Sequence, residues 1–213
     1  MTPTFVEKLY QSLLYEYGPQ HWWPITTVDR QRLPPPEPMT ERAAFEIAIG
    51  AILTQSTSWK NVELAIGNLK RARVLRPTGI ARLPLATLTR LIRPSGYYQQ
   101  KAKKLKAFAA WLNDHGGRLL VWSSKRTLRE ARTELLTVHG IGPETADSIL
   151  LYACSKPTFV VDAYTKRFLT AHGRHATSYD AVKRYFTERL PRSAHIYQEY
   201  HALIVRWGKE KSE

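Results

Sequence analysis

The segment from residue 128 to residue 153 constrains the fold more than any other part of this chain. Apolar residues recur at helical spacing on both sides of a central turn: Leu128, Ala131, Leu135 and Val138 before it, and Ala146, Ile149, Leu150 and Ala153 after it. Gly140 and Gly142 in the turn permit backbone conformations that other residues resist, and Pro143 is favoured in the first turn of a helix. The pattern therefore predicts two helices joined by a tight hairpin.

A hairpin of this kind favours the binding of a phosphate group. The start of its second helix leaves backbone N–H groups unpaired with no bulky side chain nearby, which suits a phosphate group. The chain carries 32 Lys and Arg residues against 18 Asp and Glu, a formal net charge of +14. In a chain so basic, we expect the phosphate to belong to nucleic acid. Composition alone also fits a soluble protein with a basic surface and no polyanionic partner.

Cysteine and hydrophobic content exclude several classes of protein. The single cysteine, Cys154, excludes an internal disulfide and an iron–sulfur or zinc site ligated by cysteines of this chain alone. The histidines show no metal-ligand spacing, since His172 and His175 lack a third ligand motif. No stretch approaches the ~20 apolar residues that span a bilayer, and the N-terminus lacks a secretory pattern. We expect a cytoplasmic protein with no membrane partner, associated with the nucleoid if the source is bacterial.

Nearly every periodic segment predicts a helix. Residues 42–54 are apolar on almost all sides, which indicates a buried central helix. The prolines from 34 to 38 exclude helix and central strand there, and residues 209–213 are typical of a fraying tail. No strand pattern extends beyond the four residues 158–161. We therefore expect an all-α protein of roughly ten helices, the others lying near 5–17, 59–72, 85–92, 99–113, 163–172, 179–190 and 194–208.

Four separated motifs resemble those of one enzyme family. Residues 136–147 (LTVHGIGPETAD) and 159–167 (FVVDAYTKR) resemble the helix-hairpin-helix and aspartate signature of the endonuclease III superfamily of DNA glycosylases. Residues 51–57 resemble the family's glutamine-bearing helix end, and residues 96–102 resemble its backbone-contacting turn. The motifs occur in the family's order, and the resemblance extends from about Phe45 to Trp207.

Two departures from the family's motifs indicate which members of the family this chain resembles most. Bifunctional members carry a lysine nucleophile two residues after the second hairpin glycine, where this chain has Glu144. Iron–sulfur members carry four cysteines near the C-terminus, where residues 203–209 of this chain have none. With residues 22–24 (WWP), these departures make the chain most similar to the clusterless 3-methyladenine DNA glycosylases.

The resemblance implies a specific architecture and partner. It predicts two helical lobes with DNA lying across the cleft between them. Residues 42–153 would form a central lobe that includes the hairpin, and residues 1–41 would combine with 154–213 into the second lobe. The expected partner is double-stranded DNA with a damaged base, bound by a monomer.

Asp162 is the candidate catalytic residue. Cleavage of an N-glycosidic bond develops positive charge on the sugar, which a carboxylate stabilises while it orients or deprotonates water. Local sequence also fits a helix N-cap at Asp162, since a helical pattern begins at Ala163. The two roles are compatible.

Glu144 bears on the type of reaction. A Schiff-base lyase needs an amine, so a carboxylate at this position predicts a glycosylase that leaves the abasic strand intact. Glu144 also suits the first turn of a helix. An alkylated purine carries positive charge and is already a good leaving group. To remove such a base, an enzyme needs mainly to recognise it and to place one carboxylate beside the sugar.

The predicted base pocket holds aromatic side chains. A cationic ring stacks on aromatic faces for up to about 2 kcal/mol when desolvated. Trp22, Trp23 and Phe45 would supply such faces and Pro24 a wall, although tryptophans are also common in cores. By resemblance, Glu144 and Lys209 also line the pocket, and Lys209 equally fits a tail residue.

Several residues are candidates for DNA contact. The target base must leave the duplex. Gln55 resembles the family residue that inserts into the gap left by the extruded base, and Tyr97 or Tyr98 would wedge into the duplex from the opposite side. A surface role for Gln55 and packing roles for the two tyrosines stay open. Phosphate contacts would come from the backbone of Gly140, Ile141 and Gly142, with the Thr145 hydroxyl and Lys101 beside Lys103, Lys104 and Lys106. By resemblance, the carbonyls of Leu136, Val138 and Ile141 would bind a monovalent cation, with no other cofactor.

The leading prediction is thus a base excision repair enzyme that removes an alkylated purine such as 3-methyladenine. A glycosylase for an oxidised or mismatched base is an alternative. A DNA-binding helix-hairpin-helix protein without catalysis is another, and Asp162 separates it from the enzyme. The sequence does not rank the lesions, and it offers no role for the proline loop at 33–38.

Overall fold

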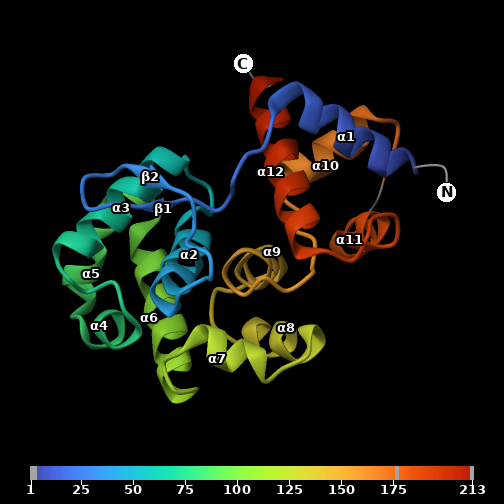
Figure 1. The fold of residues 1–213 in the computed structure, drawn as a ribbon. Coiled ribbons are helices and arrows are strands. Elements are labelled where there is room, and N and C mark those ends of the chain that lie inside the picture. The colour runs from blue at the N-terminus through green and yellow to red at the C-terminus, as the bar shows by residue number, and fades with distance from the viewer. Residues whose placement is uncertain (1–3, 176–177, 212–213) are drawn as a thin grey trace.

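The computed structural model describes residues 4–175 and 178–211, and nearly all of their regular secondary structure is helical (Figure 1). The all-α prediction is confirmed. The elements are α1 (Phe5–Tyr17), β1 (Ile25–Thr26), β2 (Arg32–Leu33), α2 (Glu41–Leu53), α3 (Trp59–Arg71), α4 (Pro77–Arg82), α5 (Leu85–Leu91), the 3₁₀ turn η1 (Arg93–Ser95), α6 (Tyr98–Asp114), α7 (Leu119–Ser124), α8 (Leu128–Leu136), α9 (Pro143–Ser148), the π-helical turn η2 (Ile149–Ala153), α10 (Ala163–Ala171), α11 (Tyr179–Thr187) and α12 (Ala194–Glu210).

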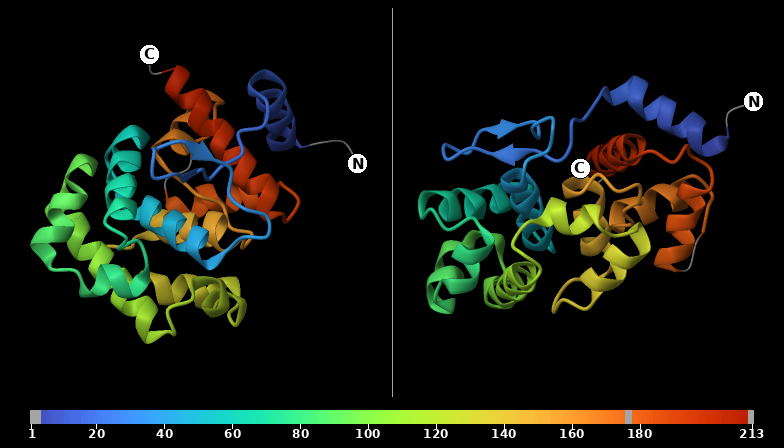
Figure 2. Two further views of the ribbon diagram at one scale, coloured as in Figure 1. Left: turned by 60° about the vertical axis from the view of Figure 1, so that its left-hand side comes forward. Right: turned by 60° about the horizontal axis from the view of Figure 1, so that its bottom comes forward.

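The helices form two groups. Figure 1 shows α2 to α6 on one side and α1, α10, α11 and α12 on the other, with α7, α8 and α9 leading from the first group to the second. Both views in Figure 2 keep α1 beside α12, although these helices lie at opposite ends of the chain. The predicted two-lobed architecture is confirmed.

Helix α2 is the centre of the first lobe. It is buried from Ala43 to Leu53, as its apolar composition predicts. The Thr40 hydroxyl caps its start by accepting from the Ala43 N–H at 3.2 Å. Helices α3, α6, α7 and α9 and the turn η2 all pack around it. The last turn of α2 therefore places Gln55 close to the hairpin that begins α9.

The N-terminal 41 residues divide between the two lobes. Helix α1 packs on α12, where the Tyr200 hydroxyl donates to the Val6 carbonyl at 3.1 Å. The β1–β2 hairpin instead packs on the first lobe, because the Thr26 N–H donates to Glu46 Oε1 at 2.7 Å. Lys70 on α3 pairs with Glu46 at 2.5 Å. The prediction that residues 1–41 belong wholly to the second lobe is therefore corrected: the chain crosses between lobes before β1.

The remaining differences between the predicted and the observed secondary structure concern short elements and one helix end. Strands β1 and β2 pair antiparallel, Ile25 with Leu33 and Thr26 with Arg32, and two-residue strands leave no periodicity to read. Helices α4 and α7 have six residues each and were not expected. Helix α12 continues to Glu210, so Lys209 lies on a helix and not in a fraying tail. Within the described residues, no helix has the length and apolar character needed to cross a bilayer.

Candidate active site at the start of helix α10

Asp162 is the N-cap of α10, and its two carboxylate oxygens have different neighbours. Oδ1 accepts from the backbone N–H of Thr165 at 2.7 Å and from its hydroxyl at 3.0 Å. Oδ2 lies 3.5 Å from Nε2 of His201 on α12. The side chain is 17% exposed, so one edge of the carboxylate stays accessible. The N-cap role is confirmed, and it leaves Oδ2 available for chemistry.

These neighbours keep the Asp162 carboxylate charged. Burial acts to raise the pKa of Asp162, but His201 and the two donors of Thr165 outweigh it, so the pKa lies below its ordinary value of 3.8. A carboxyl group with a lowered pKa is ionised throughout the neutral range. Asp162 therefore presents a negative charge at a partly enclosed position.

His201 and Tyr152 belong to the site, and the sequence reasoning missed both. The Tyr152 hydroxyl lies 2.7 Å from Nδ1 of His201, and both side chains are buried. His201 lies at helical spacing from Tyr197 and Ile204, within the helix predicted near 194–208. A histidine among the apolar residues of that helix was the available signal.

The two tryptophans have different surroundings. Trp22 is half-buried, with its ring 6.2 Å from the His201 ring and 6.3 Å from that of Tyr152. Lys209 Nζ lies 6.0 Å from the centre of the Trp22 ring. Trp23 is buried and packs edge-on against Trp59 at 5.3 Å. Trp22 thus lies beside His201, the neighbour of Asp162, and Lys209 lies beside Trp22. Trp23 is a core residue that also contacts Tyr152, at 5.2 Å.

Phe45 and Pro24 complete the predicted pocket residues. Phe45 is buried with its ring stacked on Phe108 at 6.1 Å. It also lines a cavity of 460 Å³ with Arg42, Arg76 and others at the start of α2. This placement argues against Phe45 as a wall of a base pocket beside Asp162, because α2 is buried from Ala43 onward and the Phe45 ring packs into the first lobe. Pro24 is half-buried next to the tryptophans in the chain.

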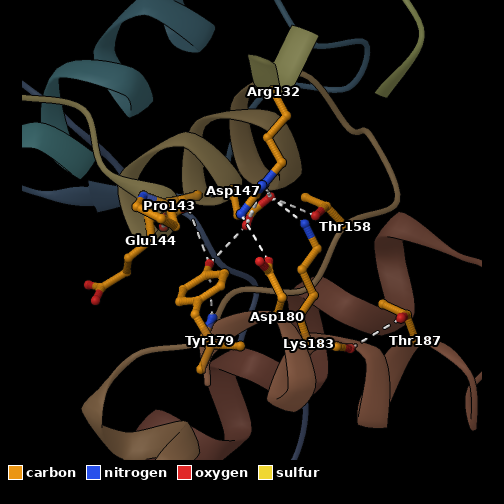
Figure 3. Close-up of polar contacts among 11 residues, drawn as sticks. Arg132, Pro143, Glu144, Asp147, Thr158, Tyr179, Asp180, Lys183 and Thr187 are labelled. Carbon is orange, nitrogen blue, oxygen red and sulfur yellow. Dashed lines mark hydrogen bonds and ion pairs between the residues drawn. The ribbon is translucent and has the colours of Figure 1, made fainter. Parts of the chain in front are cut away.

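Glu144 is close enough to Asp162 for the two carboxylates to interact electrostatically. It lies in the first turn of α9, at the surface. Partial desolvation, followed by the negative charge of Asp162, raises the pKa of Glu144. Figure 3 shows its side chain pointing away from the neighbouring Asp147. The position that holds a lysine in bifunctional members thus holds a carboxylate on the Asp162 side of the hairpin.

The hairpin has the conformation that its glycines predict. Gly140 has a φ of +83°, and a side chain there would collide with Lys104. Gly142 is the N-cap of α9, and a Cβ added there would meet nothing within 4 Å. The backbone at the start of α9 is therefore exposed, with no side chain covering Gly142. Ile141 is buried and anchors the loop to the core.

Gln55 forms hydrogen bonds with two other candidates for DNA contact. Its amide nitrogen donates to the Thr145 hydroxyl at 2.9 Å, and its amide oxygen accepts from Lys104. Thr145 is 5% exposed, so its hydroxyl serves Gln55, and a phosphate contact by Thr145 is not supported. Gln55 thus bridges the end of α2 and the hairpin.

Lys101 has a structural role in place of the predicted DNA contact. Its side chain is 2% exposed, and Nζ donates to the carbonyls of Leu53 at 2.8 Å and Ser95 at 2.5 Å. Burial, with a contribution from Lys104, lowers the pKa of Lys101 to about 8. A basic run on a helix does not reveal which lysine turns inward. Tyr97 is 73% exposed and Tyr98 half-buried at the start of α6, so Tyr97 stays available for DNA.

The cation site at the hairpin stays a prediction. Of the three carbonyls, that of Val138 accepts from the Ile141 N–H at 3.0 Å, and Leu136 is exposed at the end of α8. In the described part of the chain, His, Cys, Asp and Glu side chains form no cluster of three or more that could hold a metal ion.

A buried carboxylate links the hairpin to the Asp162 segment. Asp147 Oδ1 accepts from Lys183 at 2.7 Å and from the Thr158 hydroxyl at 2.8 Å (Figure 3). Oδ2 accepts from the Tyr179 hydroxyl at 2.9 Å, and Arg132 contacts both oxygens at 3.2 Å. The cluster joins α8, α9 and α11 to the segment that leads into Asp162.

Comparisons with known proteins agree with the geometry. The model of the HhH-GPD superfamily of base excision DNA repair proteins matches residues 49–192. A protein of Methanocaldococcus jannaschii that carries the provisional name of DNA repair glycosylase is 43% identical over 209 residues, 96% of this chain and 87% of that protein. Endonuclease III of Sulfolobus acidocaldarius is 26% identical over 79% of this chain and 74% of its own length.

Solved structures share the architecture. The 3-methyladenine DNA glycosylase of H. pylori, bound to 1,N6-ethenoadenine, matches with a TM-score of 0.79 and 29% identity over 97% of this chain and 98% of that one. A non-covalent endonuclease III–DNA complex matches with a TM-score of 0.74 at 19% identity over 96% and 84%, a likeness in fold alone. The resemblance read from the sequence is confirmed. The chain belongs to the HhH-GPD superfamily of base excision DNA repair proteins.

Proposed function

We propose that this DNA glycosylase hydrolyses the N-glycosidic bond of an alkylated purine, such as 3-methyladenine, in double-stranded DNA. The observation that carries the proposal is the ionised, partly exposed carboxylate of Asp162, with His201 beside it and the half-buried ring of Trp22 6.2 Å from the His201 ring. As the bond breaks, positive charge develops on the deoxyribose, and a fixed negative charge beside it lowers the barrier. The proposed reaction uses a carboxylate and water.

The substrate class follows from the charge of the leaving group. A methylated purine is cationic in the nucleotide and departs as a neutral base, so the enzyme needs little acid catalysis. Trp22 offers an aromatic face for such a ring, worth up to about 2 kcal/mol when desolvated. The H. pylori 3-methyladenine glycosylase, which matches nearly the whole chain, supports this choice.

A panel of duplexes tests the substrate class. Each duplex carries one defined lesion: 3-methyladenine, 7-methylguanine, 1,N6-ethenoadenine, hypoxanthine, uracil, thymine glycol or 8-oxoguanine. Chromatography measures the free base that the protein releases. We expect release of the methylated purines to exceed release of the other bases. Release confined to thymine glycol, uracil or 8-oxoguanine would contradict the alkylated-purine assignment.

We further propose that the protein leaves the abasic strand intact. An imine forms only on an amine, and the residue at the hairpin position is Glu144. After incubation with an abasic duplex at neutral pH, denaturing electrophoresis is expected to show uncut strands, and alkali added afterwards is expected to cleave them. Efficient cleavage of the abasic strand without heat or alkali would contradict this proposal and indicate an amine nucleophile elsewhere in the site.

A further inference from the structure

His201 places its two ring nitrogens between two different groups. Nδ1 lies 2.7 Å from the Tyr152 hydroxyl, and Nε2 lies 3.5 Å from Oδ2 of Asp162. The His201 side chain is buried, and Nε2 has no hydrogen-bond partner among the described residues. The rings of Trp22 and Phe159 enclose the imidazole at 6.2 Å and 6.5 Å. Nε2, which has no hydrogen-bond partner in this packing, therefore faces the carboxylate of Asp162.

The proton on Nε2 follows from this arrangement. A neutral imidazole has one N–H and one acceptor nitrogen, and a bare acceptor would repel the ionised Asp162. If His201 is neutral, Nε2 therefore carries the proton and Nδ1 accepts from the Tyr152 hydroxyl. If His201 is charged, both nitrogens donate, and the Tyr152 hydroxyl can donate to the Gln198 carbonyl 3.2 Å away. Both protonation states direct an N–H toward Oδ2.

We propose that His201 is a positioning residue for Asp162. Its Nε2–H restrains Oδ2 while Thr165 restrains Oδ1, so the carboxylate keeps one orientation when DNA covers the site. The 3.5 Å separation in the free protein shortens to a hydrogen bond in the complex, as catalytic contacts commonly do. The proposal rests on the proposed role of Asp162 in base release.

The charges around Asp162 make this donor necessary. Glu144 on α9 interacts electrostatically with both Asp162 and His201, and with Lys166 on α10. Glu199 on α12 and Asp162 both act on Tyr152. Tyr152 on η2 is neutral, since burial raises its pKa well above the ordinary value. Burial raises the pKa of Asp162, and contact with His201 lowers it. Without His201, Asp162 would take up a proton at a higher pH, and the rate of base release would begin to fall at that higher pH.

Three substitutions test the proposal. His201→Leu removes the donor, His201→Gln keeps an N–H donor, and Tyr152→Phe keeps the ring but removes the hydroxyl that orients the imidazole. His195→Leu, at an exposed position on the same helix, is the matched control. Single-turnover release of 3-methyladenine at saturating enzyme is measured from about pH 3.5 to pH 8, a range that includes the acidic limb expected for Asp162. DNA affinity and melting temperature are measured in parallel.

We expect His201→Leu to slow release at pH 7 by about 10- to 100-fold and to move the acidic limb of the pH–rate profile upward by about one unit. His201→Gln should retain most of the rate, and DNA affinity should stay unchanged in both. Tyr152→Phe should shift the profile in the same direction by less. The control should behave as the wild type.

The outcomes separate this proposal from the proposed function. A wild-type profile in folded His201→Leu overturns the role of His201 and leaves the glycosylase proposal standing. If His201→Leu does not fold, Tyr152→Phe decides, and an unchanged profile in that variant overturns the proposal. If the wild-type protein releases no base from any duplex of the panel, the proposed function itself fails.

Discussion

Asp162→Asn is expected to slow base release by about 10²–10³-fold, because the substitution removes the charge that stabilises the cationic sugar. The fold should survive, since asparagine caps a helix as well as aspartate does and can accept from the Thr165 N–H. Affinity for DNA should not fall, because the loss of a negative charge does not weaken attraction to phosphates.

Single-turnover release of 3-methyladenine from a saturated duplex measures this effect. Asp114→Asn is the matched control, since Asp114 is exposed at the end of α6 and should leave the rate unchanged. Titration of labelled duplex checks that the Asp162→Asn protein is fully bound. A release rate within a few-fold of the wild type would show that another group carries the chemistry.

Asp147→Asn is expected to lower the free energy of unfolding by about 3–5 kcal/mol. The carboxylate of Asp147 is fully buried and pairs with both Arg132 and Lys183. A neutral amide leaves these two cations with only the exposed carboxylate of Asp180 as a counter-charge. Its nitrogen also cannot accept the hydrogen bonds that now reach one of the Asp147 oxygens. The loss is large beside the 5–15 kcal/mol of a typical domain.

Urea unfolding followed by circular dichroism measures this loss. Asp180→Asn is the matched control, because Asp180 also contacts Arg132, at 3.4 Å, but has a side chain that is 73% exposed. Its removal should change the free energy of unfolding by less than about 0.5 kcal/mol. Equal effects of the two substitutions would mean that burial does not set the strength of the Asp147 cluster.

Local sequence patterns were sufficient for most of the fold. Helix α1 begins and ends at the predicted residues, because its apolar spacing and its Thr4–Glu7 capping box are contained in the segment itself. The hairpin followed from two glycines and a proline for the same reason. Strand β1 is held by Glu46 and Lys70, and Arg32 of strand β2 pairs with Glu63. Because these partners come from other elements, no local sequence pattern predicts the strands.

The site was predictable where a motif fixes the backbone. Asp162 and the open backbone at Gly142 lie where their motifs predict, since the N-cap and the turn determine both. The inward turn of Lys101 depends on carbonyls of α2 and η1, and the position of His201 depends on how α12 packs. Such long-range contacts decide side-chain roles that spacing along a helix cannot distinguish.

The crystal structure of the Asp162→Asn protein bound to a duplex with one 3-methyladenine tests the role of this residue most directly. The lesion nucleotide should be extruded, with the side chain at position 162 in van der Waals or hydrogen-bond contact with its deoxyribose, at about 3–4 Å. The hairpin backbone around Gly142 should contact a phosphate of the same strand. A deoxyribose bound away from position 162, or a side chain there that no sugar can reach, would contradict catalysis by Asp162.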